Sequence, residues 1–335
     1  YEIGDPGSYL LPDVVCDFTR VTIEDRGKDC VFVSGAKGFS PTNTYKVSAT
    51  YTDGYKIVAT IVIGGPKAVK KANVIGEAIL EKTRLIFNEK GFSDYTETNI
   101  GVLGSEAIYG RDSENYIDTR EVVLRLVATH QNKSALVVLS REIAQAATGM
   151  APGVMNYLGG RPSISSSVKL FSFLLSKDYF DVSVNLDENK ISVQIIDDNQ
   201  DRSYEGAEHA VLGQSLPERA DKETRLMNLA YVRSGDKGNH ANIGVIARNP
   251  DFLPYIRHSL TIERLKNHFS HVLNGPIHCW EAPGIYGLNF LLENSLGGGG
   301  MASLNIDPQG KAYAQQIVDL KISVPDFIYD KVHKK

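Results

Sequence analysis

The chain has 335 residues, of which 42% are hydrophobic and 23% charged, so it is long enough to form about two globular domains. Its net charge of −4 argues against a nucleic-acid partner, which would need a basic face to replace phosphate counterions. No apolar run approaches the ~20 residues that cross a bilayer, so we expect no membrane partner either.

Cysteine usage bears on the compartment. Cys16, Cys30 and Cys279 lie far apart in the sequence and form no C-x-x-C pair. Neither a disulfide framework nor a zinc site is indicated, and we predict no bound metal. Unpaired thiols fit a reducing compartment, so we expect a cytoplasmic or mitochondrial-matrix location.

The first predicted element is a β-hairpin over residues 42–63. From Tyr45 to Tyr51 apolar and polar side chains alternate, which is the period of a half-buried strand. Asp53 and Gly54 form a dipeptide that favours the positive φ of a tight turn, so the following residues are predicted to be the return strand.

A helix and a strand follow the hairpin. Apolar residues at helical spacing predict a helix from about residue 68 to Lys90, and Gly91 is a suitable stop. Residues 122–129 are predicted to form a strand because they are mostly apolar and β-branched.

The next elements lead to a linker. Ser134 is predicted to cap a helix that Gly149 ends. Strands are predicted over residues 168–175 and 180–196, the latter with a turn at 187–189. Residues 197–222 are polar and lack periodicity, so they are the best linker candidate, and we place the domain boundary near residue 222.

The last hundred or so residues form a separate α+β pattern. Residues 227–232 and 243–247 predict short strands, and a helix broken near Thr261 follows them. Asp307 is expected to cap the final helix, with Pro308 in its first turn. Further strands are predicted over 277–280, 288–292 and 321–324.

The predicted fold class is therefore α/β (α+β). Residues 1–222 should form a larger mixed α/β domain. Residues 223–330 should form a small ferredoxin-like α+β sandwich, because strands alternate with two helices on one sheet.

The most unusual segment covers residues 233–239, RSGDKGN, in which every position is polar or glycine. Such a loop can present backbone N–H groups, a carboxylate, an ammonium group and amide donors at one place. Asp236 beside Lys237 predicts an acid/base pair or a site for a charged ligand. A tight glycine hairpin with solvated charges explains the same composition equally well.

Four consecutive glycines form a second candidate. The run from Gly297 to Gly300 permits positive φ and a close backbone approach, and successive N–H groups in such a loop can bind an anion. The run matches neither the phosphate-binding loop of nucleotide hydrolases nor the dinucleotide-binding fingerprint. A flexible turn is the alternative interpretation.

The third candidate is Arg161, which follows two glycines and offers a bidentate fork for a carboxylate or phosphate. A surface arginine after a turn is the alternative. The predicted catalytic residues are Asp236 and Lys237, and the predicted substrate-binding residues are Arg161, Arg233, Ser234, Asn239, Asn242, Gly297, Gly298, Gly299 and Gly300.

Blocks of consecutive residues along the chain also carry a resemblance. They cover residues 9–17, 41–51 with 53–54, 151–153, 159–162, 233–239, 242–248, 288–290, 297–300 and 307–311. Together these blocks resemble the acyclic terpene utilisation (AtuA-type) family over essentially the whole chain. On this resemblance, residues 1–222 are the C-terminal part of the family's core domain, residues 223–330 are its ferredoxin-fold domain, and an N-terminal half of a longer polypeptide is missing.

The family is associated with the degradation of isoprenoid alcohols and acids such as citronellol and geraniol through CoA thioesters. The resemblance implies no particular reaction. We expect an enzyme of acyclic isoprenoid or branched-chain acid catabolism that acts on a CoA thioester or related carboxylate. Its substrate would be a small anion, with coenzyme A as a possible part of it, and the protein would form a homo-oligomer. The alternative is a non-catalytic binding or assembly subunit whose polar loop makes subunit contacts.

Overall fold

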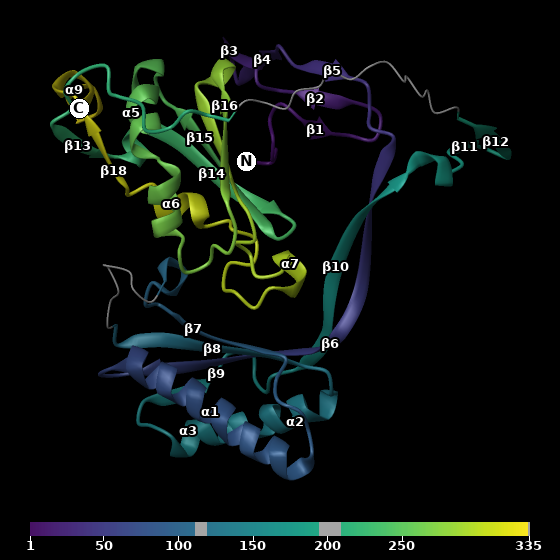
Figure 1. Cartoon of the computed structure of the whole chain (residues 1–335). Helices are drawn as coiled ribbons and strands as arrows, with labels where there is room; N and C mark the ends of the chain where they lie inside the picture. Colours follow the sequence, from purple (N-terminus) through teal and green to yellow (C-terminus); the bar gives the residue numbers. More distant parts are fainter. Residues whose placement is uncertain (111–118, 194–208, 334–335) are drawn as a thin grey trace.

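The computed structural model describes residues 1–110, 119–193 and 209–333. Within these ranges the chain forms two layered units and a cluster of short strands close to the N-terminus (Figure 1). No helix in the described ranges combines the length and the apolar character needed to cross a membrane.

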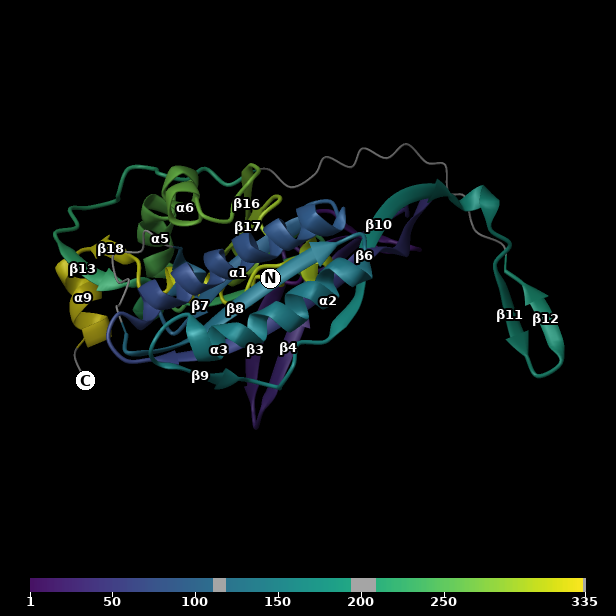
Figure 2. The same cartoon turned by 90° about the horizontal axis from the view of Figure 1, so that it is seen from below.

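The first unit is an antiparallel sheet with helices on one face (Figure 1, Figure 2). Strand β6 lies between β8 on one side and β9 with β10 on the other, and β7 pairs with the far side of β8. Its strands are β6 (Thr44–Gly64), β7 (Glu97–Leu103), β8 (Glu121–His130), β9 (Val154–Tyr157) and β10 (Ile164–Ser176). Its helices are α1 (Ala68–Lys90), η1 (Ala107–Tyr109), α2 (Lys133–Glu142), η2 (Ile143–Gln145) and α3 (Ala146–Gly149).

Helix α1 packs its apolar stripe onto the sheet. Ile79 and Phe87 of the helix and Ile61 of β6 are each at most 1% exposed. The helix ends where the sequence predicts, because Gly91 adopts φ 71° and its N–H bonds to the last-turn carbonyls.

The predicted hairpin over residues 42–63 is wrong, because β6 is one continuous strand. Its partner at the first half is β10, which returns from much later in the chain. Asp53 and Gly54 lie opposite the single residue Ser167, so the positive φ of 72° at Gly54 forms a β-bulge instead of a turn. A side chain at Gly54 would also meet the carbonyl oxygen of His130 at 2.7 Å.

The predicted N-cap at Ser134 is also wrong by two residues. Asn132 caps α2, and its side-chain oxygen accepts the backbone N–H of Ser134 at 2.9 Å. The helical path continues through η2 and α3 to Gly149, as the sequence predicts.

Beyond the sheet, β6 and β10 continue as a two-stranded ribbon, which we call the arm: residues 44–52 and 168–176 (Figure 1). The short helix η3 (Lys177–Tyr179) and a hairpin at its far end follow. The hairpin strands β11 (Ser183–Leu186) and β12 (Asn189–Ser192) flank Asp187, whose φ is 54°, which confirms the predicted turn. Residues 194–196 of the predicted strand lie outside the described ranges.

The second unit is a four-stranded antiparallel sheet of order β14-β15-β17-β16, with helices over one face. The fold class expected from the sequence is confirmed, with this unit as the ferredoxin-like part. The strands are β14 (Ala230–Lys237), β15 (His240–Ala247), β16 (Ile277–Ala282) and β17 (Gly287–Leu292), and β13 (Lys222–Arg225) pairs separately with β18 (Lys321–Val324). The helices are α4 (Leu226–Leu229), η4 (Pro250–Phe252), α5 (Leu253–Ser259), α6 (Ile262–His268), η5 (Pro283–Ile285), α7 (Gly299–Ala302), α8 (Tyr313–Ile317) and α9 (Asp326–His333).

One predicted detail of this unit is confirmed and two others differ from expectation. The helix break is confirmed, since Thr261 caps α6 by accepting the N–H of Arg264. Asp307 does not cap the helix predicted to follow it, which is α8 and begins only at Tyr313. Its carboxylate instead accepts two backbone N–H groups in the turn before α8. Part of the predicted linker packs against this unit's core, through Ala210, Leu212, Leu216 and Ala220.

The N-terminal segment lies against the second unit, although it belongs to the first in sequence (Figure 1). Gly284, in the turn after β16, lies so close to Val21 that a Cβ would approach its carbonyl oxygen to 2.1 Å. The segment contains β1 (Tyr9–Leu10), β2 (Val15–Asp17), β3 (Thr22–Gly27), β4 (Cys30–Ser34) and β5 (Lys37–Phe39).

Candidate functional site

Most of the predicted polar loop is strand. Residues 233–237 belong to β14, and only Gly238 and Asn239 form the turn to β15. Since successive side chains of a strand point to opposite faces, Arg233 and Lys237 lie on one face of the sheet, and Ser234 lies on the face that packs against the helices.

The face opposite the helices is covered by the first residues of the chain. The Arg233 guanidinium lies 5.0 Å from the centre of the Tyr1 ring. The Lys237 ammonium is 3.2 Å from a carboxylate oxygen of Glu2, and this ion pair lowers the pKa of Glu2. These two predicted site residues therefore hold the N-terminal segment.

Asn242 is fully buried beneath the same segment. Its side-chain amide donates to the carbonyl of Ile3 at 3.1 Å and to the side-chain oxygen of Asn289 at 2.7 Å. Asn289 in turn donates to the carbonyls of Ile3 and Gly4. The two asparagines thus bind extended backbone on this face.

The helix-side residue Ser234 holds a loop of the second unit. Its hydroxyl donates to the carbonyl of Gly310 at 2.6 Å and accepts the N–H of Ala314 at 2.9 Å. Close by, the Asp236 carboxylate lies 3.9 Å from the Lys311 ammonium. Both residues support residues 303–313, which we call the cleft loop.

The glycine run touches the end of β14. The side-chain oxygen of Asn239 accepts the N–H of Gly298 at 2.7 Å. Gly297, Gly298 and Gly299 all have positive φ, and a Cβ on Gly299 would approach the Gly238 carbonyl to 2.6 Å. The structure therefore brings the polar turn and the glycine run together, but this N–H group is used within the protein.

Arg161 lies apart from these residues. It is exposed in the loop between β9 and β10, next to Pro162, whose carbonyl accepts the hydroxyl of Ser140 from α2. No hydrogen bond or ion pair among the described residues joins Arg161 to the second unit.

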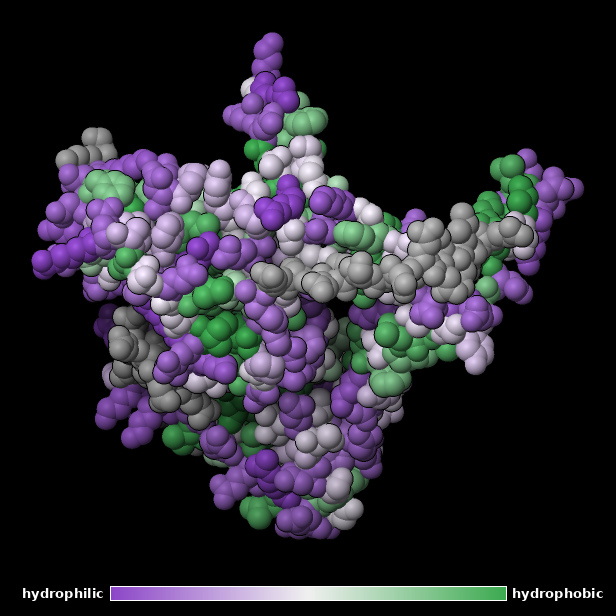
Figure 3. Space-filling model, turned by 45° about the horizontal axis from the view of Figure 1, so that its top comes forward, coloured by the Kyte–Doolittle hydropathy of each residue, from purple (hydrophilic) through white to green (hydrophobic). Residues whose placement is uncertain are grey.

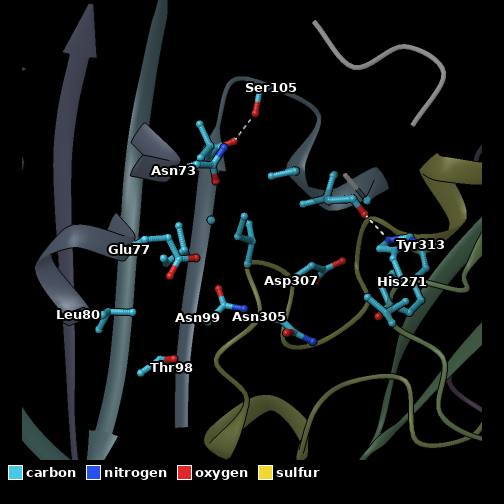
Figure 4. A pocket seen from close by; sticks show the side chains of 18 of the residues that line it. Asn73, Glu77, Leu80, Thr98, Asn99, Ser105, His271, Asn305, Asp307 and Tyr313 are labelled. Atoms are coloured by element: carbon cyan, nitrogen blue, oxygen red, sulfur yellow. Dashed lines mark hydrogen bonds between the residues drawn. The ribbon is translucent and has the colours of Figure 1, made fainter. Parts of the chain in front are cut away.

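A cleft of about 630 Å³ lies between the two units (Figure 4). Asn73 and Glu77 project into it from α1, while Asn305 and Asp307 of the cleft loop project from the opposite wall (Figure 4). Its lining also includes Leu80, Arg84, Thr98, Asn99, Ile100, Gly101, Val102, Ser105, Ala107, Ile108, Gly110, His271, Val272, Ile306 and Tyr313.

Three contacts join the walls of this cleft. Gly101 of β7 lacks a side chain where Ile306 packs, and a Cβ there would approach the Ile306 Cδ1 to 2.8 Å. Arg125 of β8 donates to the carbonyl of Leu304 at 2.7 Å. The His271 ring donates from Nε2 to the carbonyl of Ile108 at 2.9 Å, so the cleft loop and the turn after α6 are both fixed to the first unit.

The polar groups of the cleft differ in how free they are. Asp307 accepts the N–H groups of Lys311 and Ala312, so its carboxylate is engaged. Glu77 is exposed and forms no hydrogen bond or ion pair with any described residue. Tyr313 donates its hydroxyl to the Ser295 carbonyl, and burial raises its pKa, so it stays neutral and structural.

The sequence reasoning did not identify this cleft. Of its polar lining residues, Asp307 was predicted as a helix cap and not as part of a site. The available signal was a stripe on α1: Asn73, Glu77 and Arg84 recur at the i, i+4, i+11 spacing of one helix face. In the described ranges, no three His, Cys, Asp or Glu side chains gather as a metal site would require.

Comparison with known proteins identifies the family. Residues 1–186 match the model of the acyclic terpene utilisation family protein AtuA, and residues 224–323 match the AtuA ferredoxin-like domain. Neither the curated proteins nor the solved structures yielded a match. The expectation that the chain is the second half of a longer family member is not supported by these two matches. Because the first model alone covers more than half of the chain, the protein belongs to the acyclic terpene utilisation family AtuA.

Proposed function

We propose that this protein is an enzyme of acyclic isoprenoid or branched-chain acid catabolism that binds a CoA thioester or related carboxylate in the cleft between its two units. The observation that carries the proposal is the composition of this cleft. Its walls come from both family segments and combine apolar side chains with carboxylate, amide and guanidinium groups.

The size and the apolar part of the cleft suit a branched acyl chain. Its volume of about 630 Å³ lies within the ~300–1,000 Å³ typical of small-molecule sites. Leu80, Ile100, Val102 and Ile306 supply apolar wall. Each methylene buried there would contribute about 0.8 kcal/mol to binding.

The polar part of the cleft suits proton transfer next to a carbonyl group. Glu77 has an unengaged carboxylate and can accept a proton from the carbon beside a thioester. The charge that then develops on the carbonyl oxygen needs hydrogen-bond donors, and the side-chain amides of Asn73, Asn99 and Asn305 line the same cleft. In this proposal Glu77 is the general base.

Arg84 offers a charge for the anionic part of the ligand. Its Nε lies 3.0 Å from the Asp94 carboxylate, so the exposed end of the guanidinium keeps donors for a second anion. It lies two helical turns beyond Glu77 on the same face of α1.

The residues predicted from the sequence have a supporting role here. Ser234, Asp236 and Asn239 hold the cleft loop and the glycine run that precedes it. A loop fixed at this many points keeps Asn305 in place while a ligand binds.

A binding experiment and an exchange experiment together test the proposal. The thermal shift of the protein is measured with citronellic acid, its CoA thioester and CoA alone, because a ligand that binds only the native state raises Tm. Exchange of the α-proton of the thioester in deuterated buffer is followed by NMR. We expect Glu77→Gln to keep the thermal shift and slow the exchange by roughly 100-fold or more.

The matched control is Glu81→Gln, which removes the same charge one turn further along α1 at a residue outside the cleft. It should behave as wild type. A thermal shift without any exchange would favour a binding subunit over an enzyme. If none of these ligands raises Tm, the cleft is not the substrate site.

A further inference from the structure

The arm leaves an apolar surface uncovered by any described part of the chain (Figure 1, Figure 3). In its register Phe171 pairs with Ala49 and Phe173 with Val47, so these four side chains share one face. The rings of Phe171 and Phe173 stack at 5.7 Å. We call this surface the arm face.

The exposure of these side chains is high for their size. Phe171 is 58% exposed, Phe173 39% and Tyr51, on the same face, 51%. A lone two-stranded ribbon is marginal in water, so apolar residues of this kind need a further layer to pack against.

The hairpin at the end of the arm has the same character. Val184 pairs with Ile191, so they share a face, and they are 52% and 50% exposed. Leu186, two positions along that face from Val184, is 60% exposed. The hairpin projects well away from both units (Figure 2).

The area involved matches one side of a protein interface. A fully buried aromatic side chain removes ~150–250 Å² from water, so Tyr51, Phe171, Phe173 and the 77% exposed Tyr179 leave roughly 400 Å². The exposed aliphatic residues of the hairpin, with Leu170 and Leu174 on the opposite face of the ribbon, add about as much again. Summed over the arm and the hairpin, the area approaches the ~800 Å² that each partner contributes to a standard interface, and it exceeds the largest patch of most monomers.

We propose that the arm face is the docking surface for a second copy of this chain. A closed two-fold dimer presents the same surface from both copies, so an apolar face meets an apolar face without needing a second kind of patch. The charge at its edge does not oppose this contact, because Lys169 forms an ion pair with Asp53 of the bulge where the arm begins. An apolar centre with a polar rim is the usual anatomy of a protein interface.

A lipid layer fits the arm less well. The opposite face of the ribbon carries Lys46 and the hydrogen-bonded pair Ser48 and Ser172. The exposed Leu170 and Leu174 also lie on that face, so a flat lipid surface would cover only part of the apolar side chains of the arm. A membrane covering the apolar face would also have to desolvate the Lys169–Asp53 pair, which a protein rim leaves in contact with water.

Sedimentation velocity of the full chain over a wide concentration range tests the proposal. We expect reversible dimerisation, weakened roughly 30-fold or more in Phe171→Glu, the scale of losing one buried aromatic anchor. Ser172→Glu is the matched control, since it adds the same charge at the neighbouring position on the opposite face of the ribbon, and it should dimerise like wild type. Circular dichroism checks that each variant is folded.

A second measurement decides the matter if Phe171→Glu does not fold. A mixture of normal and ¹⁵N-labelled wild-type chains is cross-linked at lysines, and links between Lys46 or Lys169 of two different copies are expected. The proposal is overturned if wild type stays monomeric at every concentration, if Phe171→Glu dimerises as well as Ser172→Glu, or if mixed-isotope links at the arm are missing. Monomers that bind phosphatidylcholine–phosphatidylglycerol vesicles through Phe171 would show a membrane surface instead.

Discussion

The side-chain oxygen of Asn239 accepts the backbone N–H of Gly298 at 2.7 Å, which ties the turn after β14 to the glycine run. The amide of the same side chain donates to Asn294 at 3.1 Å. Its backbone carbonyl accepts the N–H groups of Ser295 and Leu296. One asparagine therefore fixes the chain that leads into the cleft loop.

Asn239→Ala should loosen this chain. The substitution removes the acceptor for Gly298 and the donor for Asn294, and each lost bond costs about 1 kcal/mol. We expect the free energy of unfolding in urea to fall by about 1–2 kcal/mol and hydrogen exchange at the Gly298 amide to accelerate.

Asn239→Asp separates the two bonds, because it keeps an acceptor for Gly298 and loses only the donor to Asn294. Protection of the Gly298 amide should then be retained. Equal exchange rates in the two variants would mean that the glycine run is held by other contacts.

The contact between Gly101 and Ile306 leads to a second prediction, which concerns the interface between the two units. A Cβ on Gly101 would lie 2.8 Å from the Ile306 Cδ1, so Gly101→Ala must displace the cleft loop. We expect a loss of about 1–3 kcal/mol in the free energy of unfolding.

Ile306→Val removes the atom that clashes and should restore most of that loss in the double variant. Alone it should cost less than the ~0.5–1.5 kcal/mol of a buried methyl group, because Ile306 is only partly buried. Urea unfolding of the four proteins closes a double-mutant cycle. Additive effects would show that the two side-chain positions do not compete for the same space.

The elements that followed from sequence are those in which local signals agree. Helix α1 has both a continuous apolar stripe and a glycine stop, and the structure has it as predicted. The dipeptide at Asp53 and Gly54 shows the limit of such signals. Positive φ at Gly54 serves a turn or a bulge equally well, and the choice was made by β10, more than a hundred residues away in sequence.

The candidate site shows the same limit. Residues 233–239 were interpreted as one loop because none is apolar, yet their period-two alternation places Ser234 and Lys237 on opposite faces. Gly235, which disguises this strand, and Gly244 of the neighbouring β15 leave room for Tyr1. The cleft was harder to predict, since its walls come from α1, β7 and the cleft loop, which meet only in the folded chain.

The stability of the second unit should depend on pH through His268. Burial lowers the pKa of this imidazole, and the neighbouring His271 and Arg264 lower it further. Its Nε2 is buried without a hydrogen-bond partner among the described residues. The unfolded chain therefore binds the proton more readily than the folded one, and stability present above the ordinary value of 6.5 is lost as pH falls from there toward the folded-state pKa.

His268→Gln should remove this part of the pH dependence. Between about pH 7.5 and about pH 5.5 the variant should lose less stability than wild type in urea unfolding. His333→Gln, at an exposed histidine of α9, is the control and should keep the slope of wild type. A variant at His268 with an unchanged slope would show that other groups are responsible for it.

Asp236→Ala distinguishes the role expected from composition from the role that the structure favours. As a catalytic group, Asp236 would be indispensable for turnover. In the structure its carboxylate is 34% exposed and lies 3.9 Å from the Lys311 ammonium, beside the cleft loop. An exposed pair of this kind contributes at most about 1 kcal/mol, so we expect turnover to fall by less than ~10-fold and stability to change little.

The comparison with Glu77→Gln decides between these roles, because both variants remove one carboxylate and only Glu77 lies in the cleft. The rate of α-proton exchange should be at least about 10-fold lower in Glu77→Gln than in Asp236→Ala. Asp236→Asn, which keeps the shape of the side chain without its charge, tests whether the effect of Asp236 is electrostatic. Loss of exchange in Asp236→Ala and Asp236→Asn alike, with Glu77→Gln active, would place the chemistry at the end of β14, and the cleft would then serve the acyl chain alone.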